Sequence, residues 1–241
     1  MGLFGFGKGG GGKIERLEKK VTNKWGQSFE RLRAMQQLAD IGSDEALKTL
    51  LKRFTFRTEG GIADEEEKRQ AFDYLVAAGE RAVPAIEDFV STQDGVYWPL
   101  RAVKEIVGID RAVELLLRAL DRAETVEGRI NEVKVQLVSN MRDFQHPRTL
   151  ERLKALCHDP NDDVRIMAVD AILTYGEKDA LPVIAERILD TGESPRIKGV
   201  VFEQLIELEW SVESYRAALE EAGVIPPNYK IGPAGKVERA G

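Results

Sequence analysis

Apolar residues recur along the chain at the spacing of amphipathic helices, and these helices come in pairs. Within residues 162–190, one stripe stands at i, i+3, i+4 and i+7, which is typical of a buried helix face: Ala168, Ala171, Ile172 and Tyr175. Gly176 follows and predicts the end of that helix, because glycine accepts the left-handed conformation of a C-terminal turn. A second stripe then predicts a second helix: Leu181, Ile184, Ala185 and Ile188.

The same helical pair repeats six times. A small or apolar core position recurs at intervals of 31 to 37 residues: Ala34, Ala71, Ala102, Leu137, Ala168 and Val201. A second apolar position follows each of these four residues later: Leu38, Leu75, Ile106, Met141, Ile172 and Leu205. This period predicts a stack of helical pairs over about residues 28–222, in which each pair buries its apolar face on its neighbours.

A third column of residues is basic. Three residues before each core position, every repeat but the third carries a cation, and the third carries proline: Arg31, Lys68, Pro99, Lys134, Arg165 and Lys198. We expect these cations to bond acidic groups of the adjoining repeat and so to form a structural ladder. A phosphate-binding stripe is the alternative interpretation.

The repeats resemble HEAT repeats, and in particular the short bacterial form found in phycobilisome-lyase-type HEAT proteins. The residues that carry the resemblance are the VRxxAxxAI run at 164–172, the AVPAI and ALPVI openings of second helices, and the helix-ending Gly42, Gly79 and Gly176. The fourth and sixth repeats depart from it, with Gln145 and Glu209 at the turn. The resemblance implies an all-α fold: a right-handed α-solenoid of about six HEAT-like helical pairs, whose second helices line a concave face.

The ends of the chain differ from this pattern. We expect residues 1–12 to be a flexible Gly-rich leader, and residues 13–225 to be the solenoid, opened by an N-terminal cap helix at 13–25 that buries Ile14, Leu17 and Val21. Residues 226–241 leave the helical pattern at Pro226-Pro227, and form either a small hairpin or a disordered tail.

The charge distribution disfavours a nucleic-acid partner. The 241-residue chain carries a net charge of −6, yet residues 1–24 hold six basic and two acidic residues and residues 226–241 hold three and one. The repeats between them are therefore strongly acidic and would repel a phosphate backbone. A single cysteine and no apolar run long enough to cross a membrane suggest a reducing, cytoplasmic location.

Residues suited to catalysis or metal binding are few. His146 precedes Pro147 at a predicted helix start, which favours a capping role. Cys157 and His158 are adjacent in a helix and so point about 100° apart, which disfavours a nucleophile and base pair. We expect a buried cysteine, no catalytic residue, no metal and no cofactor. The alternative function is that of an enzyme or enzyme-assisting chaperone of the lyase-like or DNA-glycosylase-like HEAT kind. The glycosylases of this kind use tryptophans near the damaged base, but we expect Trp25, Trp98 and Trp210 to be core or cap residues.

The most favoured function is therefore that of a non-catalytic scaffold or adaptor, with a protein partner bound on the concave face. Charges of both signs on the second helices would give specificity. The candidate partner-binding residues are Lys48, Lys52, Arg53, Glu87, Asp88, Glu114, Arg118, Arg152, Glu186 and Arg187.

The N-terminal sequence MGLFGFGKGGGGKIER overlays two phosphate-loop patterns, but it lacks the preceding buried strand that such loops require. Leu3, Phe4 and Phe6, followed by a basic helix, suggest instead either a plain leader or a tip that makes weak contact with a membrane surface or a partner.

Overall fold

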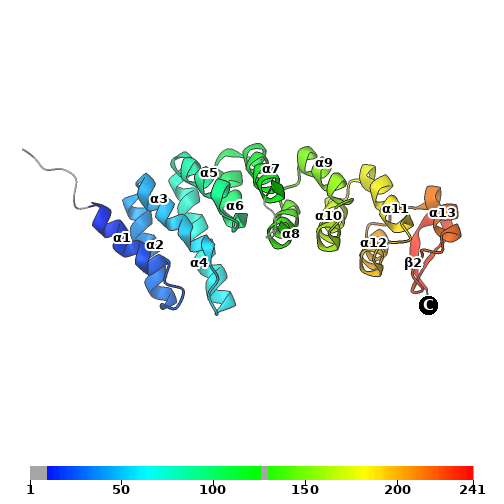
Figure 1. Cartoon of the computed structure of the whole chain (residues 1–241), viewed down its shortest axis with the longest axis horizontal. Coiled ribbons are helices and arrows are strands. Elements are labelled where there is room, and N and C mark those ends of the chain that lie inside the picture. The colour runs from blue at the N-terminus through cyan, green and yellow to red at the C-terminus, as the bar shows by residue number, and fades with distance from the viewer. Residues whose placement is uncertain (1–9, 126–129, 241) are drawn as a thin grey trace, which may run out of the picture. The chain divides into compact units, whose positions relative to one another are not determined.

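The computed structural model describes residues 10–125 and 130–240, and these residues form helices throughout except for one C-terminal hairpin (Figure 1). The chain divides into two compact units, Met1–Asp121 and Arg122–Gly241. We call them the N-terminal and C-terminal units, and each is described by itself. The predicted all-α helical-repeat fold is confirmed.

The N-terminal unit holds α1 and the first helical pairs. Short 3-10 turns follow two of its helices, η1 (Lys52–Thr55) and η2 (Gly79–Ala82). Its helices are α1 (Gly10–Val21), α2 (Ser28–Ile41), α3 (Asp44–Leu51), α4 (Gly61–Ala78), α5 (Val83–Thr92), α6 (Tyr97–Val107) and α7 (Ile109–Thr125), the last of which runs past the unit's end. The first helices α2, α4 and α6 pack side by side, and the second helices α3 and α5 form the other layer (Figure 1).

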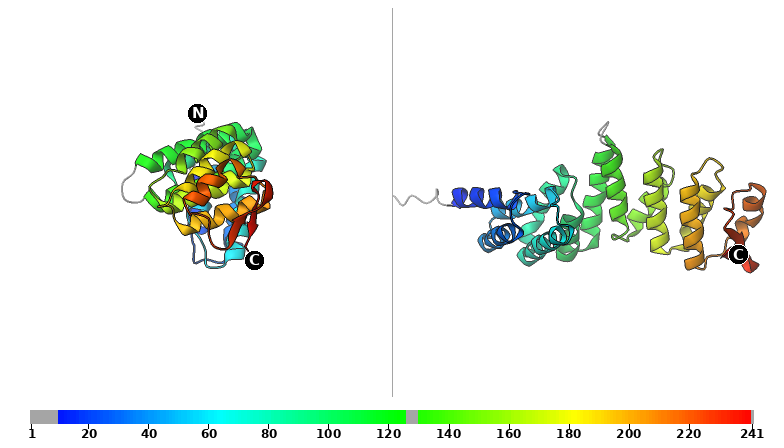
Figure 2. Two further views of the ribbon diagram at one scale, coloured as in Figure 1. Left: turned by 90° about the vertical axis from the view of Figure 1, so that its right-hand side faces the viewer. Right: turned by 90° about the horizontal axis from the view of Figure 1, so that it is seen from below.

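The C-terminal unit repeats this arrangement and ends in the hairpin. Its elements are α8 (Ile130–Met141), α9 (Pro147–Leu156), α10 (Asp162–Tyr175), η3 (Lys178–Ala180), α11 (Leu181–Leu189), α12 (Pro195–Glu207), η4 (Glu213–Tyr215), α13 (Arg216–Glu221), β1 (Tyr229–Ile231), η5 (Pro233–Gly235) and β2 (Val237–Arg239). Here α10 packs between α8 and α12. The antiparallel strands β1 and β2 pair Ile231 with Val237, and β2 lies against α12 (Figure 2).

The core follows the predicted columns. The six aligned core positions, from Ala34 to Val201, are each at most 1% exposed. The residues four positions later are buried as well, except Ile106, which is half-buried. The repeat period therefore located the buried face of each first helix.

Glycines close several of the first helices as the sequence indicates, whereas the fourth and sixth pairs lack one. Gly42 and Gly176 adopt left-handed conformations, with φ of 58° and 69°. In the sixth pair Glu209 stands at the turn with φ of 52°, a conformation that strains a residue with a Cβ atom. Side-chain caps then start several helices, such as Ser43 before α3 and Asn161 before α10.

The N-terminal helix differs from the expected 13–25. Helix α1 spans Gly10–Val21, and Ile14, Leu17 and Val21 are buried, as expected, where α1 packs on α2 and α3. The chain turns away at Asn23, whose side-chain oxygen accepts a hydrogen bond from the backbone N–H of Trp25. Trp25 is consequently 72% exposed, and the prediction that it is a core or cap residue is wrong.

The other two tryptophans lie inside their units. Trp210 is buried. Trp98 is half-buried in α6, with its ring centroid 5.6 Å from that of Phe72 in α4, and the guanidinium of Arg101 lies over both rings. This aromatic and cationic cluster occupies the repeat in which Pro99 replaces the basic column residue.

Candidate functional site

The predicted partner-binding residues lie on the second helices α3, α5, α7, α9 and α11 or in η1 directly after α3, and most have exposed or half-exposed side chains. Arg53 is the exception. Its side chain is fully buried, so the prediction that it belongs to the binding surface is wrong. The loop at residues 56–60 folds back over it: the carbonyl of Phe56 accepts a hydrogen bond from Arg53, and the Phe56 ring lies 4.6 Å from its guanidinium.

In the N-terminal unit, ion pairs link each second helix to the next. Lys48 of α3 contacts Asp88 of α5 at 2.7 Å, and the hydrogen bond from this lysine raises its own pKa. Glu87 of α5 contacts Arg111 of α7 at 2.5 Å. These pairs are exposed or half-exposed, so solvent screens them and each contributes little to stability.

The same arrangement recurs within the C-terminal unit. Arg152 of α9 pairs with Glu124, and His158, just after α9, lies 3.8 Å from Glu186 of α11. The mixed charges that the sequence places on the second helices are thus largely paired with one another. A partner that binds this surface would exchange these pairs for its own.

The buried Arg53 belongs to a cluster of charges between α2, η1 and α4. Glu67 accepts hydrogen bonds from Arg31 and Arg53, and Asp64 accepts from Arg53 at 2.7 Å. Burial alone would raise the pKa of Glu67, but the hydrogen bonds from Arg31, Ser28 and Arg53 outweigh it and lower the pKa. Arg31 also donates to the carbonyl of Asn23, so the cluster holds the loops that precede both α2 and α4.

The C-terminal unit contains a matching cluster. Arg165 of α10 and Arg187 of α11 both contact Glu193, which is 5% exposed, at 2.8 Å and 3.5 Å. In each cluster the first arginine is the column residue of a first helix and the second follows it by 22 residues, at the end of the second helix. The acid comes from the start of the next repeat. The expected ladder to the adjoining repeat is therefore present at Arg31 and Arg165, and Lys134 contacts Asp159 in the same way.

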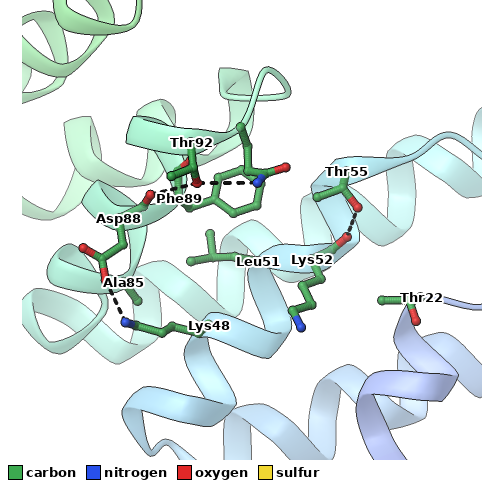
Figure 3. A pocket seen from close by; sticks show the side chains of 10 residues that line it. Thr22, Lys48, Leu51, Lys52, Thr55, Ala85, Asp88, Phe89 and Thr92 are labelled. Atoms are coloured by element: carbon green, nitrogen blue, oxygen red, sulfur yellow. Dashed lines mark hydrogen bonds and ion pairs between the residues drawn. The ribbon is translucent and has the colours of Figure 1, made fainter. Parts of the chain in front are cut away.

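A cavity of about 430 Å³ opens on the second-helix surface of the N-terminal unit (Figure 3). Leu51 of α3 together with Ala85 and Phe89 of α5 form its apolar floor, and all three are at least nine-tenths buried. The Lys48–Asp88 ion pair closes one end, and Thr22, just after α1, stands at the other end (Figure 3). The remaining lining residues are polar: Lys52, Thr55, Thr92 and Gln93.

The pocket includes three of the ten predicted residues, Lys48, Lys52 and Asp88. Sequence reasoning missed its floor, because Leu51 and Phe89 follow the ordinary apolar stripe of a core position. The threonines of the pocket, Thr22, Thr55 and Thr92, were also not predicted, because isolated threonines form no pattern that indicates a binding site. Lys52 forms an ion pair with Glu18 of α1 at 2.6 Å, so α1 borders the pocket on this side.

The reactive residues of the sequence have structural surroundings. His146 caps α9, where its Nδ1 accepts a hydrogen bond from the backbone N–H of Arg148, as expected. Cys157 is fully buried, and this burial raises the pKa of its thiol to about 12. Among the described residues, no group of three or more His, Cys, Asp or Glu side chains is arranged to hold a metal ion.

Several features bear on contacts outside the pocket. Leu3, Phe4 and Phe6 lie outside the described residues. Exposed apolar side chains are found at Trp25, Phe29 and Ile62, next to the loops that the Arg31 cluster holds. Within residues 10–125 and 130–240, no helix combines the length and the apolar composition needed to cross a bilayer.

The helices and the pocket described above define a helical-repeat protein, and the comparison with protein families agrees with this class. A family model described as HEAT repeats matches residues 122–205 and supports a HEAT-repeat protein. The narrower resemblance to phycobilisome-lyase-type proteins is not supported. No curated protein matches the chain.

Proposed function

We propose that the chain is a scaffold or adaptor that binds a protein partner on its second-helix surface. The observation that carries the proposal is the pocket between α3 and α5, which combines an apolar floor with a rim of ion pairs. HEAT repeats are commonly protein-interaction scaffolds, and stacked helical pairs present extended surfaces for this purpose.

The energetics of the rim favour binding at this surface. The Lys48–Asp88 and Lys52–Glu18 pairs are exposed enough to contribute little to folding, so a partner can replace them at small cost. The apolar floor offers what a hot spot requires, a concave site in which a side chain of the partner loses its contact with water. The other predicted residues on α5, α7, α9 and α11 would extend the contact or set its specificity by charge.

The test is affinity capture from the native cell with the full chain and two matched variants. Lys52→Glu changes the pocket rim, whereas Arg69→Glu changes an exposed residue of α4, a first helix. We expect a stoichiometric protein partner that wild type and Arg69→Glu retain and that Lys52→Glu loses. A partner retained equally by all three proteins, or no stoichiometric protein at all, would contradict the proposal.

A further inference from the structure

One flank of helix α1 carries basic side chains without an acidic one among them. With about 100° of rotation per residue, three of these side chains fall within about 60° of one another around the helix axis, and a fourth follows just after the helix ends. We call these four exposed residues the basic flank: Lys13, Arg16, Lys20 and Lys24. The two acids of the helix, Glu15 and Glu18, fall on the other side of its buried apolar stripe.

The charge of the basic flank is not balanced by neighbouring carboxylates. Glu15 pairs with Lys19 and Glu18 pairs with Lys52, so other cations already engage both acids of α1. Among the described residues, no carboxylate lies within ion-pair distance of any of the four cations of the flank. The flank is therefore a patch of uncompensated positive charge on a chain whose net charge is −6.

Two exposed aromatic rings follow the basic flank. Trp25 is 72% exposed, and the ammonium group of Lys24 lies 4.8 Å from the centroid of its ring. Phe29, in the first turn of α2, is 67% exposed. The single acid within residues 22–33 is Glu30, against the exposed Lys24 and Arg33, so the charge around the rings stays positive. Exposed apolar side chains beside charged ones are typical of an interaction surface.

Exposed cations beside an indole ring suit the surface of an anionic bilayer. Tryptophan is enriched at the boundary between membrane and water, where its ring lies at the level of the headgroups. Lysine and arginine side chains beside it reach the anionic groups of the lipids. Because Trp25 protrudes, a folded acidic protein would need a recess shaped to receive it, whereas a bilayer accepts the ring without one.

We propose that the basic flank, together with Trp25 and Phe29, docks the N-terminal unit on an anionic lipid surface. The cations would contact the charged headgroups, and the two rings would enter the headgroup layer. This inference goes beyond the proposed function and does not rest on it. Glu18, which borders the pocket through Lys52, lies on the other side of the buried stripe of α1, so the lipid surface and the pocket use different flanks of the helix.

Co-sedimentation of the full chain with liposomes tests the inference. One set of vesicles contains phosphatidylcholine alone, and the other contains about one third phosphatidylserine. We expect the chain to sediment with the anionic vesicles at low salt and to remain in solution with phosphatidylcholine alone. Binding should be lost at about 0.5 M salt, because salt screens interactions between exposed charges.

Matched variants locate the contact. Lys20→Gln combined with Lys24→Gln should weaken binding at least about tenfold, since each cation near an anionic membrane strengthens binding by about fivefold. Arg148→Gln combined with Lys178→Gln removes the same charge from exposed positions of the C-terminal unit and should bind as wild type does. Trp25→Ser should weaken binding about tenfold through the lost ring. All these side chains are exposed, so the melting temperatures should match that of wild type.

Four results would overturn the inference. The first is a chain that does not sediment with the anionic vesicles. The second is wild-type binding by both the Lys20/Lys24 variant and Trp25→Ser, which would also be the result if residues 1–9 made the contact. The third is an equal loss of binding in the Arg148/Lys178 control, because net charge would then be the cause. The fourth is a single-stranded RNA oligonucleotide that binds in a Lys20- and Lys24-dependent way while the vesicles do not.

Discussion

Arg31 and Arg53 lie in different elements of the N-terminal unit, yet both donate to the same oxygen of Glu67, Oε2, from 2.8 Å and 2.7 Å. The three side chains are almost completely buried. Paired charges in such a place contribute modestly to stability as a set, but the removal of one member leaves a buried charge with fewer partners away from water. The cluster is therefore a sensitive point of the fold.

Replacement of the shared carboxylate tests this directly. Glu67→Gln keeps the size of the side chain but removes the carboxylate that the buried Arg31 contacts, while Arg53 keeps its ion pair with Asp64. We expect it to lower the free energy of unfolding by about 3 kcal/mol. Urea denaturation followed by circular dichroism measures the change. Glu65→Gln on the same helix is the control, because the Glu65 side chain is 63% exposed. Equal denaturation midpoints for the two variants would show that the cluster is not needed for stability.

Acid should weaken the protein through the same group. The pKa of Glu67 is lower in the folded state than its ordinary value of 4.5, so its contribution to stability is complete above that value and is lost as the pH falls through the folded pKa. The pKa of Glu193 is lowered in the same way. We expect a melting temperature that is steady near neutral pH and falls below about pH 4.5. Glu67→Gln should show a shallower fall, and an identical slope would argue against this origin of the acid sensitivity.

Gly95 in the loop between α5 and α6 has no room for a side chain. A Cβ atom at this position would stand 2.5 Å from the carbonyl oxygen of Phe54, well inside van der Waals contact. We expect Gly95→Ala to destabilise the protein by about 1–3 kcal/mol through the forced backbone shift. Gly61→Ala in the first turn of α4 is the matched control, because no atom lies within 4 Å of its added Cβ. Thermal denaturation of the two variants should separate them, and similar melting temperatures would contradict the expected clash.

The thiol of Cys157 should be unreactive in the native protein. Burial raises its pKa to about 12, so almost no thiolate exists near neutral pH, and the side chain has no exposed surface. We expect slow reaction with Ellman's reagent at about pH 8 and rapid reaction once urea unfolds the chain. A fast reaction in the absence of urea would mean that the region around α9 opens readily.

The sequence predicts the repeat architecture well because it depends on local periodicity. The helical stripes, the closing Gly42 and Gly176 and the basic column at Arg31 and Arg165 can all be read from fixed spacings. These features arise within one helical pair or between equivalent positions of neighbouring pairs. The family comparison reaches the same conclusion over residues 122–205.

The site is harder to predict because it depends on loops and on gaps between helices. Arg53 and Arg187 follow the polar side of their helices and were expected on the binding surface, but each contacts an acid of the next repeat. The burial of Arg53 requires that residues 56–60 fold over it, which no periodic pattern encodes. The pocket likewise depends on the spacing between α3 and α5, which no local pattern fixes.

The two arginine clusters also indicate where repeat length can vary. The interval between the paired arginines is 22 residues in both clusters, whereas the interval from the second arginine to the acid is 14 residues at Arg53–Glu67 and 6 at Arg187–Glu193. A one-residue insertion inside a helical pair would rotate one arginine by about 100° away from its partner. An insertion in the connection to the next repeat only lengthens a loop. The fold can thus absorb length changes between its repeats while it tolerates few within them, and grafts or tags belong in those connections.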